Sequence, residues 1–230
     1  MSTDIPTSAK EAVCLVVPVY NEATVLAQVL HMARAHFPMI VCVNDGSSDN
    51  SGDEVRKSGV ILVEHAVNLG QGAALQTGIE YALKHTQARY IATFDSDGQH
   101  EITDIEKMYA LAEEKNLAVV FGSRFLEGKS EAGALKRLVL RFAAWFTARS
   151  TGMKVTDAHN GVRLLRRDAA SMIHLKQNRM AHASEIVAQI GKTGLPWEEI
   201  PVTIAYTDYS KSKGQSLWNS VNILYDLIMG

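Results

Sequence analysis

Residues 12–22 read Ala-Val-Cys-Leu-Val-Val-Pro-Val-Tyr-Asn-Glu, a nearly continuous run of apolar and β-branched side chains that ends in a polar turn. A strand without polar alternation is typical of a parallel sheet that is covered on both faces. Apolar residues then recur at helical spacing, at Leu26, Val29, Leu30 and Ala33, which predicts a helix from about residue 23 to 35. The chain therefore opens with a strand and a covering helix.

The same alternation continues along the chain. Ser51 with Glu54, and Thr103 with Glu106, have the spacing of capping boxes and predict two further helix starts. Strands are expected at 39–43, 60–64, 89–94, 117–122, 161–165 and 200–205, and helices at 73–85, 134–151, 182–192 and 217–230. Strands that alternate with helices predict an α/β fold, a doubly wound, mostly parallel sheet with helices on both faces.

Composition narrows the class of protein. A chain of 230 residues, 47% hydrophobic and 21% charged, is expected to form a single domain over residues 1–230. Its net charge of −2 gives no basic field for nucleic acid. Cys14 and Cys42 lie in apolar runs and are predicted to be buried thiols in a reducing compartment. Residues 1–12 lack the apolar core of a signal peptide, so we expect a cytoplasmic protein.

Two helices, predicted at 134–151 and 217–230, are amphipathic and carry aromatic residues, with arginines in the first of them. Such helices can lie at a membrane surface, which predicts a peripheral protein at the inner face of the membrane. The alternative is that they pack on the core, on a second copy of the chain or on a small membrane partner protein.

An acidic turn follows the strand expected at 89–94. Asp95, Asp97 and Gln99 alternate, so their oxygens can converge on one Mg²⁺ or Mn²⁺ ion, while Gly98 lets the chain bend. A metal at this position could neutralise the leaving group of a nucleotide sugar. The alternative is an ordinary turn in which Asp and Ser cap their own backbone.

Four ordered motifs carry a resemblance to a known family. They are residues 16–22 with 43–49, residues 68–72, the acidic turn at Asp95, and Gly-Ser-Arg-Phe at 122–125. Over about residues 12–216 the chain resembles family 2 glycosyltransferases, which have the GT-A fold. The resemblance implies a nucleotide-sugar-binding half at 12–125, an acceptor half at 126–216 and an amphipathic helix at 217–230.

Within this family the chain is similar to the polyprenyl-phosphate sugar transferases. Asp95 to His100 matches their Asp-Ala-Asp-x-Gln-His turn, and Asp157 to Arg163 echoes their Asp-x-x-Ser-Gly-Phe-Arg motif. The run Lys-Ser-Lys-Gly-Gln-Ser-Leu at 211–217 matches a later basic element imperfectly, with two lysines in place of arginines.

The resemblance implies the following site residues. Asp97 and Arg124 would stabilise the leaving diphosphate, and Asp157 or Glu185 would act as general base if the acceptor is a hydroxyl. Acceptor or phosphate contacts are expected from Arg163, Lys211 and Lys213. The nucleotide sugar would be bound by Pro18, Tyr20, Glu22, Asp45, Gly70, Gly72, Asp95, Ser96, Asp97 and Arg124.

The predicted function is an inverting glycosyltransferase that uses a UDP- or GDP-linked sugar and transfers it to polyprenyl phosphate or a lipid-linked glycan. One alternative is a hydroxyl acceptor on a surface polysaccharide or lipopolysaccharide. Another is a nucleotidyltransferase, which also joins a glycine-rich nucleotide site to metal-binding carboxylates. A third is a nucleotide-sugar-binding module without activity.

Overall fold

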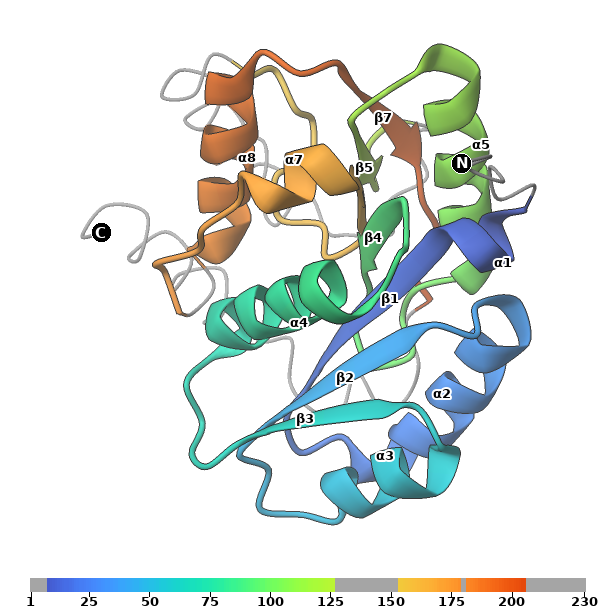
Figure 1. Cartoon of the computed structure of the whole chain (residues 1–230), viewed down its shortest axis with the longest axis vertical. Coiled ribbons are helices and arrows are strands. Elements are labelled where there is room, and N and C mark those ends of the chain that lie inside the picture. The colour runs from blue at the N-terminus through green and yellow to red at the C-terminus, as the bar shows by residue number, and fades with distance from the viewer. Residues whose placement is uncertain (1–7, 127–152, 179–180, 206–230) are drawn as a thin grey trace.

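The structure, a computed structural model, describes residues 8–126, 153–178 and 181–205. Its strands are β1 (Val13–Val19), β2 (Ile40–Asp45), β3 (Ile61–His65), β4 (Tyr90–Thr93), β5 (Val119–Ser123), β6 (Arg163–Arg166) and β7 (Trp197–Pro201). They form one seven-stranded sheet in the order β3-β2-β1-β4-β6-β5-β7 (Figure 1).

The sheet is mostly parallel, as the sequence predicts. The strand β6 is the exception, because it pairs antiparallel with both β4 and β5. From β1 the chain adds β2 and β3 on one side, and β4 lies on the other side of β1. This reversal of strand order is a topological switch point, where open α/β sheets bind ligands at the carboxyl ends of their strands.

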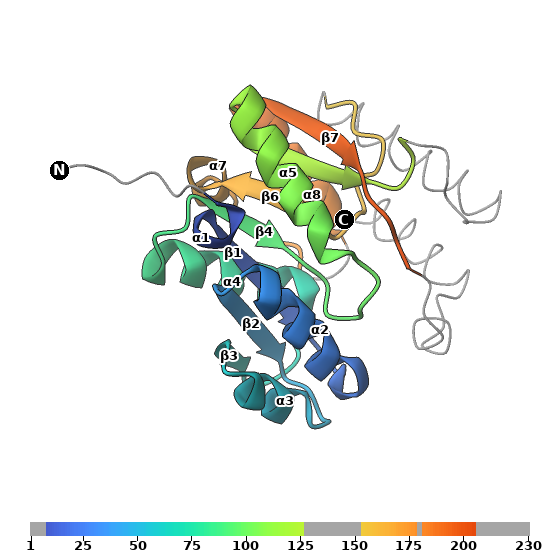
Figure 2. The ribbon, with the colours of Figure 1, turned by 90° about the vertical axis from the view of Figure 1, so that its right-hand side faces the viewer.

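Helices cover both faces of the sheet, as predicted (Figures 1 and 2). One face carries α2, α3 and α5, and the other carries α4, α7 and α8. The helix bounds are α1 (Ala9–Ala12), α2 (Ala23–His36), α3 (Ser51–Ser58), α4 (Gln71–His85), α5 (Ile102–Lys115), α7 (Arg167–Ser171) and α8 (His182–Thr193).

Strand β1 lies at the centre of the core. All seven of its residues are buried, and all but Pro18 alternate between the two apolar clusters on either side of the sheet. This double burial explains why its sequence lacks polar alternation. Cys14 and Cys42 are buried free thiols, as predicted, and burial raises the pKa of Cys14 to about 12.

Both predicted capping boxes are wrong. Ser51 is the first residue of α3, and its hydroxyl donates to Asp49 and accepts from the backbone N–H of Glu22. Helix α5 begins after Glu101, whose side chain makes no capping bond, and Glu106 instead contacts the ring of His36. In both cases a distant segment contacts the side chain that local spacing had assigned to a cap.

The last strand was also misplaced. It was predicted at 200–205 but begins at Trp197, because β7 pairs with β5 over that earlier stretch. The predicted helices at 134–151 and 217–230 lie outside the described residues. Within the part of the chain that the structure describes, no helix is long and apolar enough to cross a membrane.

Candidate active site

A pocket of about 560 Å³ opens at the carboxyl ends of β1, β2 and β4. Eight of the residues predicted to bind the nucleotide sugar line it: Pro18, Tyr20, Glu22, Asp45, Gly70, Asp95, Ser96 and Asp97. Val19, Asn68, Gln71 and Ala74 complete the lining. The sequence motifs that are far apart along the chain therefore meet at the switch point of the sheet.

The loops after β1 and β2 are tied to each other. Asn21 has a positive φ of 55°, and its backbone N–H donates to Ser47 Oγ over 3.0 Å. The Asn21 side-chain oxygen accepts from the backbone N–H of Ser48, and Asp49 accepts from that of Ala23. The motif at 44–49 therefore holds the loop after β1, from which Tyr20 and Glu22 line the pocket.

The acidic turn contributes two carboxylates with different surroundings. Asp95 accepts hydrogen bonds from Gln71 Nε2 at 3.0 Å and from His100 Nε2 at 3.1 Å. Asp97 accepts from the backbone N–H of Gln99 at 3.0 Å. The hydroxyl of Ser96 donates to the carbonyl of Pro18, which fixes the turn against the end of β1.

These surroundings separate the acidities of the two groups. Burial raises the pKa of Asp97 to about 6, and the charge of Asp95 adds to this effect. Burial alone would raise the pKa of Asp95, but the hydrogen bond from His100 and the electrostatic interactions with His100 and Arg163 outweigh it and lower the pKa. The pocket therefore holds an ionised Asp95 beside an Asp97 that burial and repulsion disfavour as an anion.

A divalent cation fits this pair of carboxylates, because it would offset the repulsion that raises the pKa of Asp97. Gln99, the predicted third ligand, is buried and does not line the pocket. In the described residues no group of three or more His, Cys, Asp or Glu side chains is arranged to hold a metal ion. Asp95 and Asp97 are the two carboxylates of the acidic turn that line the pocket.

Comparison with known proteins identifies the family. The chain matches the description "Glycosyl transferase family 2" over residues 14–173, which is more than half of its length. The chain belongs to family 2 of the glycosyltransferases.

Individual relatives agree with this membership. An uncharacterised protein of Methanocaldococcus jannaschii is 34% identical over 226 residues, which cover 96% of this chain and 92% of that protein. The UDP-N-acetylglucosamine–dolichyl-phosphate N-acetylglucosaminyltransferase of Methanococcus voltae is 28% identical to this chain. The match covers 96% of this chain and 96% of that protein.

A solved structure confirms the GT-A fold. Glucosyl-3-phosphoglycerate synthase from Mycobacterium tuberculosis, crystallised with Mn²⁺, UDP and glucosyl-3-phosphoglycerate, superposes with a TM-score of 0.64 at 14% sequence identity. The match covers 92% of this chain and 75% of that one. At this identity the likeness concerns the fold.

In this glycosyltransferase Asp45 lines the pocket, but its carboxylate is already occupied by the protein. One oxygen accepts from the backbone N–H of Leu69 and contacts His65 Nδ1 at 2.7 Å, and the other accepts from the N–H of Gly70. The other ring nitrogen of His65 contacts Thr77 at 2.9 Å. Asp45 holds the loop that leads to Gly70, and its predicted contact with the nucleotide sugar stays a prediction.

The two glycines of the 68–72 motif have different roles. Gly70 lines the pocket with φ 102°, a conformation that a side chain disfavours. Gly72 does not line it, and a Cβ at Gly72 would stand 2.1 Å from the carbonyl oxygen of Gln177. The predicted nucleotide contact at Gly72 is therefore corrected to a packing contact with the chain near residue 177.

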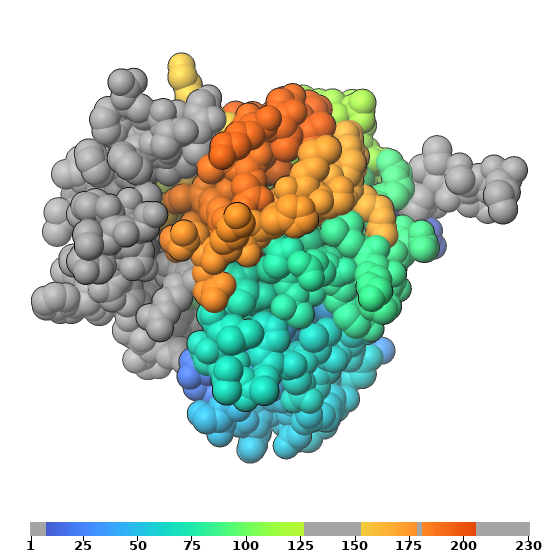
Figure 3. Space-filling view, turned by 60° about the vertical axis from the view of Figure 1, so that its left-hand side comes forward, coloured from blue at the N-terminus to red at the C-terminus, as the bar shows by residue number. Residues whose placement is uncertain are grey.

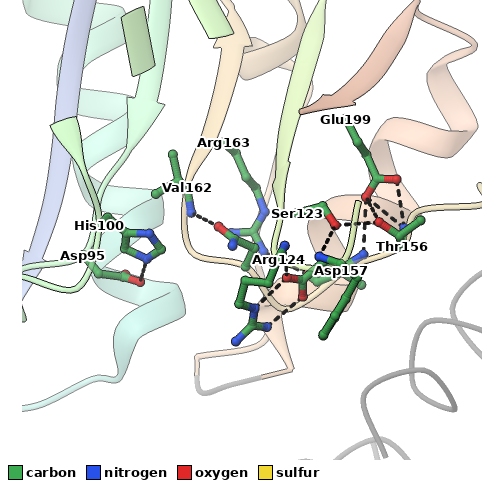
Figure 4. A network of polar contacts seen from close by, with 12 residues as sticks. Asp95, His100, Ser123, Arg124, Thr156, Asp157, Val162, Arg163 and Glu199 are labelled. Atoms are coloured by element: carbon green, nitrogen blue, oxygen red, sulfur yellow. Dashed lines mark hydrogen bonds and ion pairs between the residues drawn. The ribbon is translucent and has the colours of Figure 1, made fainter. Parts of the chain in front are cut away.

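Arg124 and Asp157 form a pair that the sequence did not predict. The Arg124 guanidinium donates to both oxygens of Asp157 at 2.6 and 2.7 Å, and the Arg124 backbone N–H donates to one of them at 3.1 Å (Figure 4). Burial would raise the pKa of Asp157, but the hydrogen bonds and charge of Arg124 lower it. Such a carboxylate is a poor proton acceptor, so the structure does not favour Asp157 as the general base.

Arg124 was predicted to bind the diphosphate, yet it does not line the pocket. The N–H groups of its guanidinium point to Asp157. Glu199 holds the chain at this point, because its carboxylate accepts from the backbone N–H groups of Thr156 and Asp157. Glu199 was missed in the sequence because nothing local connects it to residues more than forty positions earlier.

Arg163 was predicted to contact the acceptor phosphate, but it is only 1% exposed. It lies between the Asp95–His100 pair and the Arg124–Asp157 pair (Figure 4). Burial lowers the pKa of Arg163 to about 10, against the opposing charges of Asp95 and Asp157. Its position corrects the expected acceptor contact to a charge interaction inside the protein.

Glu185 was the second candidate base. Its carboxylate accepts from the backbone N–H groups of Lys176 and Gln177 and from the side chain of Gln189. It does not line the pocket, so its placement argues against proton transfer from an acceptor. Lys211 and Lys213 lie outside the described residues, and their contact with the acceptor stays a prediction.

Proposed function

We propose that this glycosyltransferase moves a sugar from a UDP- or GDP-linked donor to a polyprenyl phosphate or a lipid-linked glycan, with inversion at the anomeric carbon. The pocket at the switch point, where the acidic turn faces the loops after β1 and β2, is the observation that supports a nucleotide-sugar donor. The similarity to the Methanococcus voltae enzyme, a dolichyl-phosphate N-acetylglucosaminyltransferase, supports a polyprenyl phosphate as the acceptor.

The donor would bind along the pocket with its base toward Pro18 and Tyr20, of which Tyr20 is 47% exposed. Its diphosphate would then approach the acidic turn and the N-terminus of α4, which begins at Gln71. Helix N-termini favour anionic groups because their backbone N–H groups point outward.

Mg²⁺ or Mn²⁺ held by Asp95 and Asp97 would neutralise the charge that develops on the leaving nucleoside diphosphate. The paired carboxylates support this assignment, since burial and Asp95 raise the pKa of Asp97 to about 6. The solved relative that was crystallised with Mn²⁺ and UDP is consistent with it.

The state of the two candidate bases favours a phosphate acceptor. A hydroxyl needs a base to remove its proton, and both Asp157 and Glu185 are engaged by other protein groups. A polyprenyl phosphate is already ionised and can attack the anomeric carbon in line without such help. We therefore place the polyprenyl phosphate acceptor ahead of a saccharide hydroxyl.

Acceptor binding is assigned to the half at 126–216, including Lys211 and Lys213, and donor binding to the half at 12–125. The structure joins the halves in one sheet, with β6 between β4 and β5. We propose that the protein works at the cytoplasmic face of the membrane, where its amphipathic segments at 134–151 and 217–230 would meet the lipid.

A transfer assay tests this function. The purified chain is incubated with UDP- and GDP-sugars and Mn²⁺, with a polyprenyl phosphate in vesicles or with a free oligosaccharide, and the released nucleotide is measured. We expect nucleoside diphosphate release that depends on the lipid phosphate. Release that depends only on the oligosaccharide would favour a hydroxyl acceptor, and pyrophosphate release from a nucleoside triphosphate would favour a nucleotidyltransferase.

A further inference from the structure

Residues 174–178, which we call the strap, connect α7 with α8 without regular secondary structure. Side chains supply its hydrogen bonds. The Gln189 side chain accepts from the backbone N–H of His174 and donates to its carbonyl, over 2.7 and 2.8 Å. Gln76 of α4 accepts from the N–H of Leu175 over 2.8 Å.

Glu185 makes the largest contribution to holding the strap. Its carboxylate accepts from the N–H of Lys176 at 3.1 and 3.0 Å and from the N–H of Gln177 at 2.9 Å. It also accepts from Gln189 Nε2 at 3.2 Å, which links it to the bonds at His174. One side chain therefore fixes two consecutive backbone N–H groups, and hydrogen bonds from backbone N–H groups to a carboxylate are among the stronger hydrogen bonds.

The strap in turn contacts the first turn of α4. The backbone N–H of Gly72 donates to the carbonyl of Asn178 over 2.8 Å. A Cβ at Gly72 would stand 2.1 Å from the carbonyl oxygen of Gln177 and 2.9 Å from the Cβ of His182. Figure 3 shows the orange part of the chain that includes α8 against the blue-green α4. No side chain could be placed between the strap and α4 at this point.

The first turn of α4 reaches the pocket through Gln71. Its side-chain nitrogen donates to Asp95 Oδ1 over 3.0 Å, and Gln71 lines the pocket beside Gly70. A continuous set of contacts therefore runs from Glu185 through the strap and Gly72 to Gln71 and Asp95. Since the Gln71 side chain donates a hydrogen bond to Asp95, displacement of the first turn of α4 would also displace this donor.

We propose that Glu185 is a positioning residue, which fixes the strap against Gly72 and so holds Gln71 in place to orient Asp95. The consequence for donor binding rests on the proposed function. A residue with this role affects the affinity for the donor, whereas a general base affects the chemical step and its pH dependence.

Two substitutions separate these roles. Glu185→Gln keeps a side-chain oxygen that can accept hydrogen bonds from the strap but removes the proton acceptor, and Glu185→Ala removes both. Glu114→Ala, at an exposed position of α5, is the matched control. If Glu185→Ala does not fold, Gln76→Ala replaces it, because Gln76 holds the strap at Leu175 and does not line the pocket.

Amide hydrogen exchange tests the structural link without any ligand. In Glu185→Ala we expect exchange in residues 71–76 and 174–178 to be about tenfold faster, and we expect Glu185→Gln to show a smaller change. Glu114→Ala should leave both segments unchanged. Unchanged exchange at residues 71–76 in Glu185→Ala would overturn the proposal, whether or not the chain transfers sugar.

Steady-state kinetics test the consequence. In Glu185→Ala the KM for the nucleotide sugar should rise about tenfold with kcat changed less, and Glu185→Gln should keep kcat within about threefold and the pH profile of the native chain. A Glu185→Gln variant that loses kcat as completely as Glu185→Ala would overturn the proposal in favour of a general base. Absence of transfer by the native chain would count against the proposed function, and the exchange experiment would then decide the positioning role.

Discussion

Among single residues, the neighbouring carboxylates Asp95 and Asp97 matter most for the charge of the acidic turn in the pocket. Burial and the Asp95 charge raise the pKa of Asp97 from 3.8 to about 6, which means that the folded protein disfavours the ionised Asp97. An acid with a raised pKa in the folded state costs stability as the pH rises from its unfolded to its folded pKa. Ionisation of Asp97 should therefore lower the free energy of unfolding between about pH 4 and pH 6.

Asp97→Asn tests this cost. Without added metal, the variant should be more stable than the native chain at pH 7.5, by on the order of 2 kcal/mol, and equally stable at pH 4. Urea unfolding at both pH values, with a chelator present, measures the difference. A variant that is no more stable than the native chain at pH 7.5 would show that burial and the Asp95 charge do not disfavour the ionised Asp97.

The Arg124–Asp157 pair is the second feature at the scale of single residues. Removal of one partner leaves a buried charge without compensation, so Arg124→Gln should lower the free energy of unfolding by about 3 kcal/mol. Asp157→Asn in the same background should restore part of the loss, since it removes the unpaired charge. A double-mutant cycle measures the coupling, and additive effects of the two substitutions would contradict the pair.

The sequence predicted which residue types gather at the pocket but could not predict their partners. Eight predicted residues line it because they lie at the carboxyl ends of strands or in the loops that follow, and strand ends can be located from the apolar runs. Asp45 contacts His65 because the register of β2 and β3 places these residues side by side, and Arg124 bonds to Asp157 because the loop that holds Asp157 lies against the end of β5. No local pattern encodes either contact.

At the scale of elements, β6 brings the later part of the chain against the acidic turn. The strand pairs antiparallel with β4, and Gly161 just before it lies against Asp95. A Cβ at Gly161 would stand 1.9 Å from Asp95 Oδ2, which is closer than two such atoms can approach. The glycine therefore permits the register in which Asp95 reaches the pocket.

Gly161→Ala should displace Asp95 and weaken binding of Mn²⁺ about tenfold or more, because a metal ligand misplaced by about 1 Å no longer fits the site. Binding of Mn²⁺ alone can be followed by electron paramagnetic resonance. Gly194→Ala is the control, since a Cβ there meets nothing within 4 Å although its φ of +67° also disfavours a side chain. Equal Mn²⁺ affinity in the two variants would contradict the role of Gly161.

The predicted elements show what periodicity can and cannot supply. The stripe Leu26, Val29, Leu30 and Ala33 is buried as predicted, because helical spacing alone determines which face is apolar. The direction of β6 was not predictable, since a short apolar run looks the same in a parallel and an antiparallel strand. Both capping boxes were wrong because their hydroxyl and carboxylate groups have partners elsewhere in the chain.

At the scale of the whole molecule, the order of the strands explains where the site forms. Because the chain leaves β1 toward β2 on one side and β4 lies on the other, the loops after these strands separate and leave room for a ligand. The alternation of strands and helices was sufficient to predict this architecture. Segments 127–152 and 206–230, which hold the predicted membrane and lysine contacts, lie outside the described residues.

We propose above all that Asp97 and a divalent cation together bind the diphosphate of a nucleotide sugar in this pocket. Isothermal titration calorimetry with UDP and with GDP, each with and without Mn²⁺, measures this directly in the native chain and in Asp97→Asn. We predict that one nucleotide binds the native chain, that Mn²⁺ strengthens this binding, and that Asp97→Asn loses the Mn²⁺-dependent part, about a hundredfold in affinity. Equal Mn²⁺-dependent affinity in the native chain and in Asp97→Asn would contradict the account.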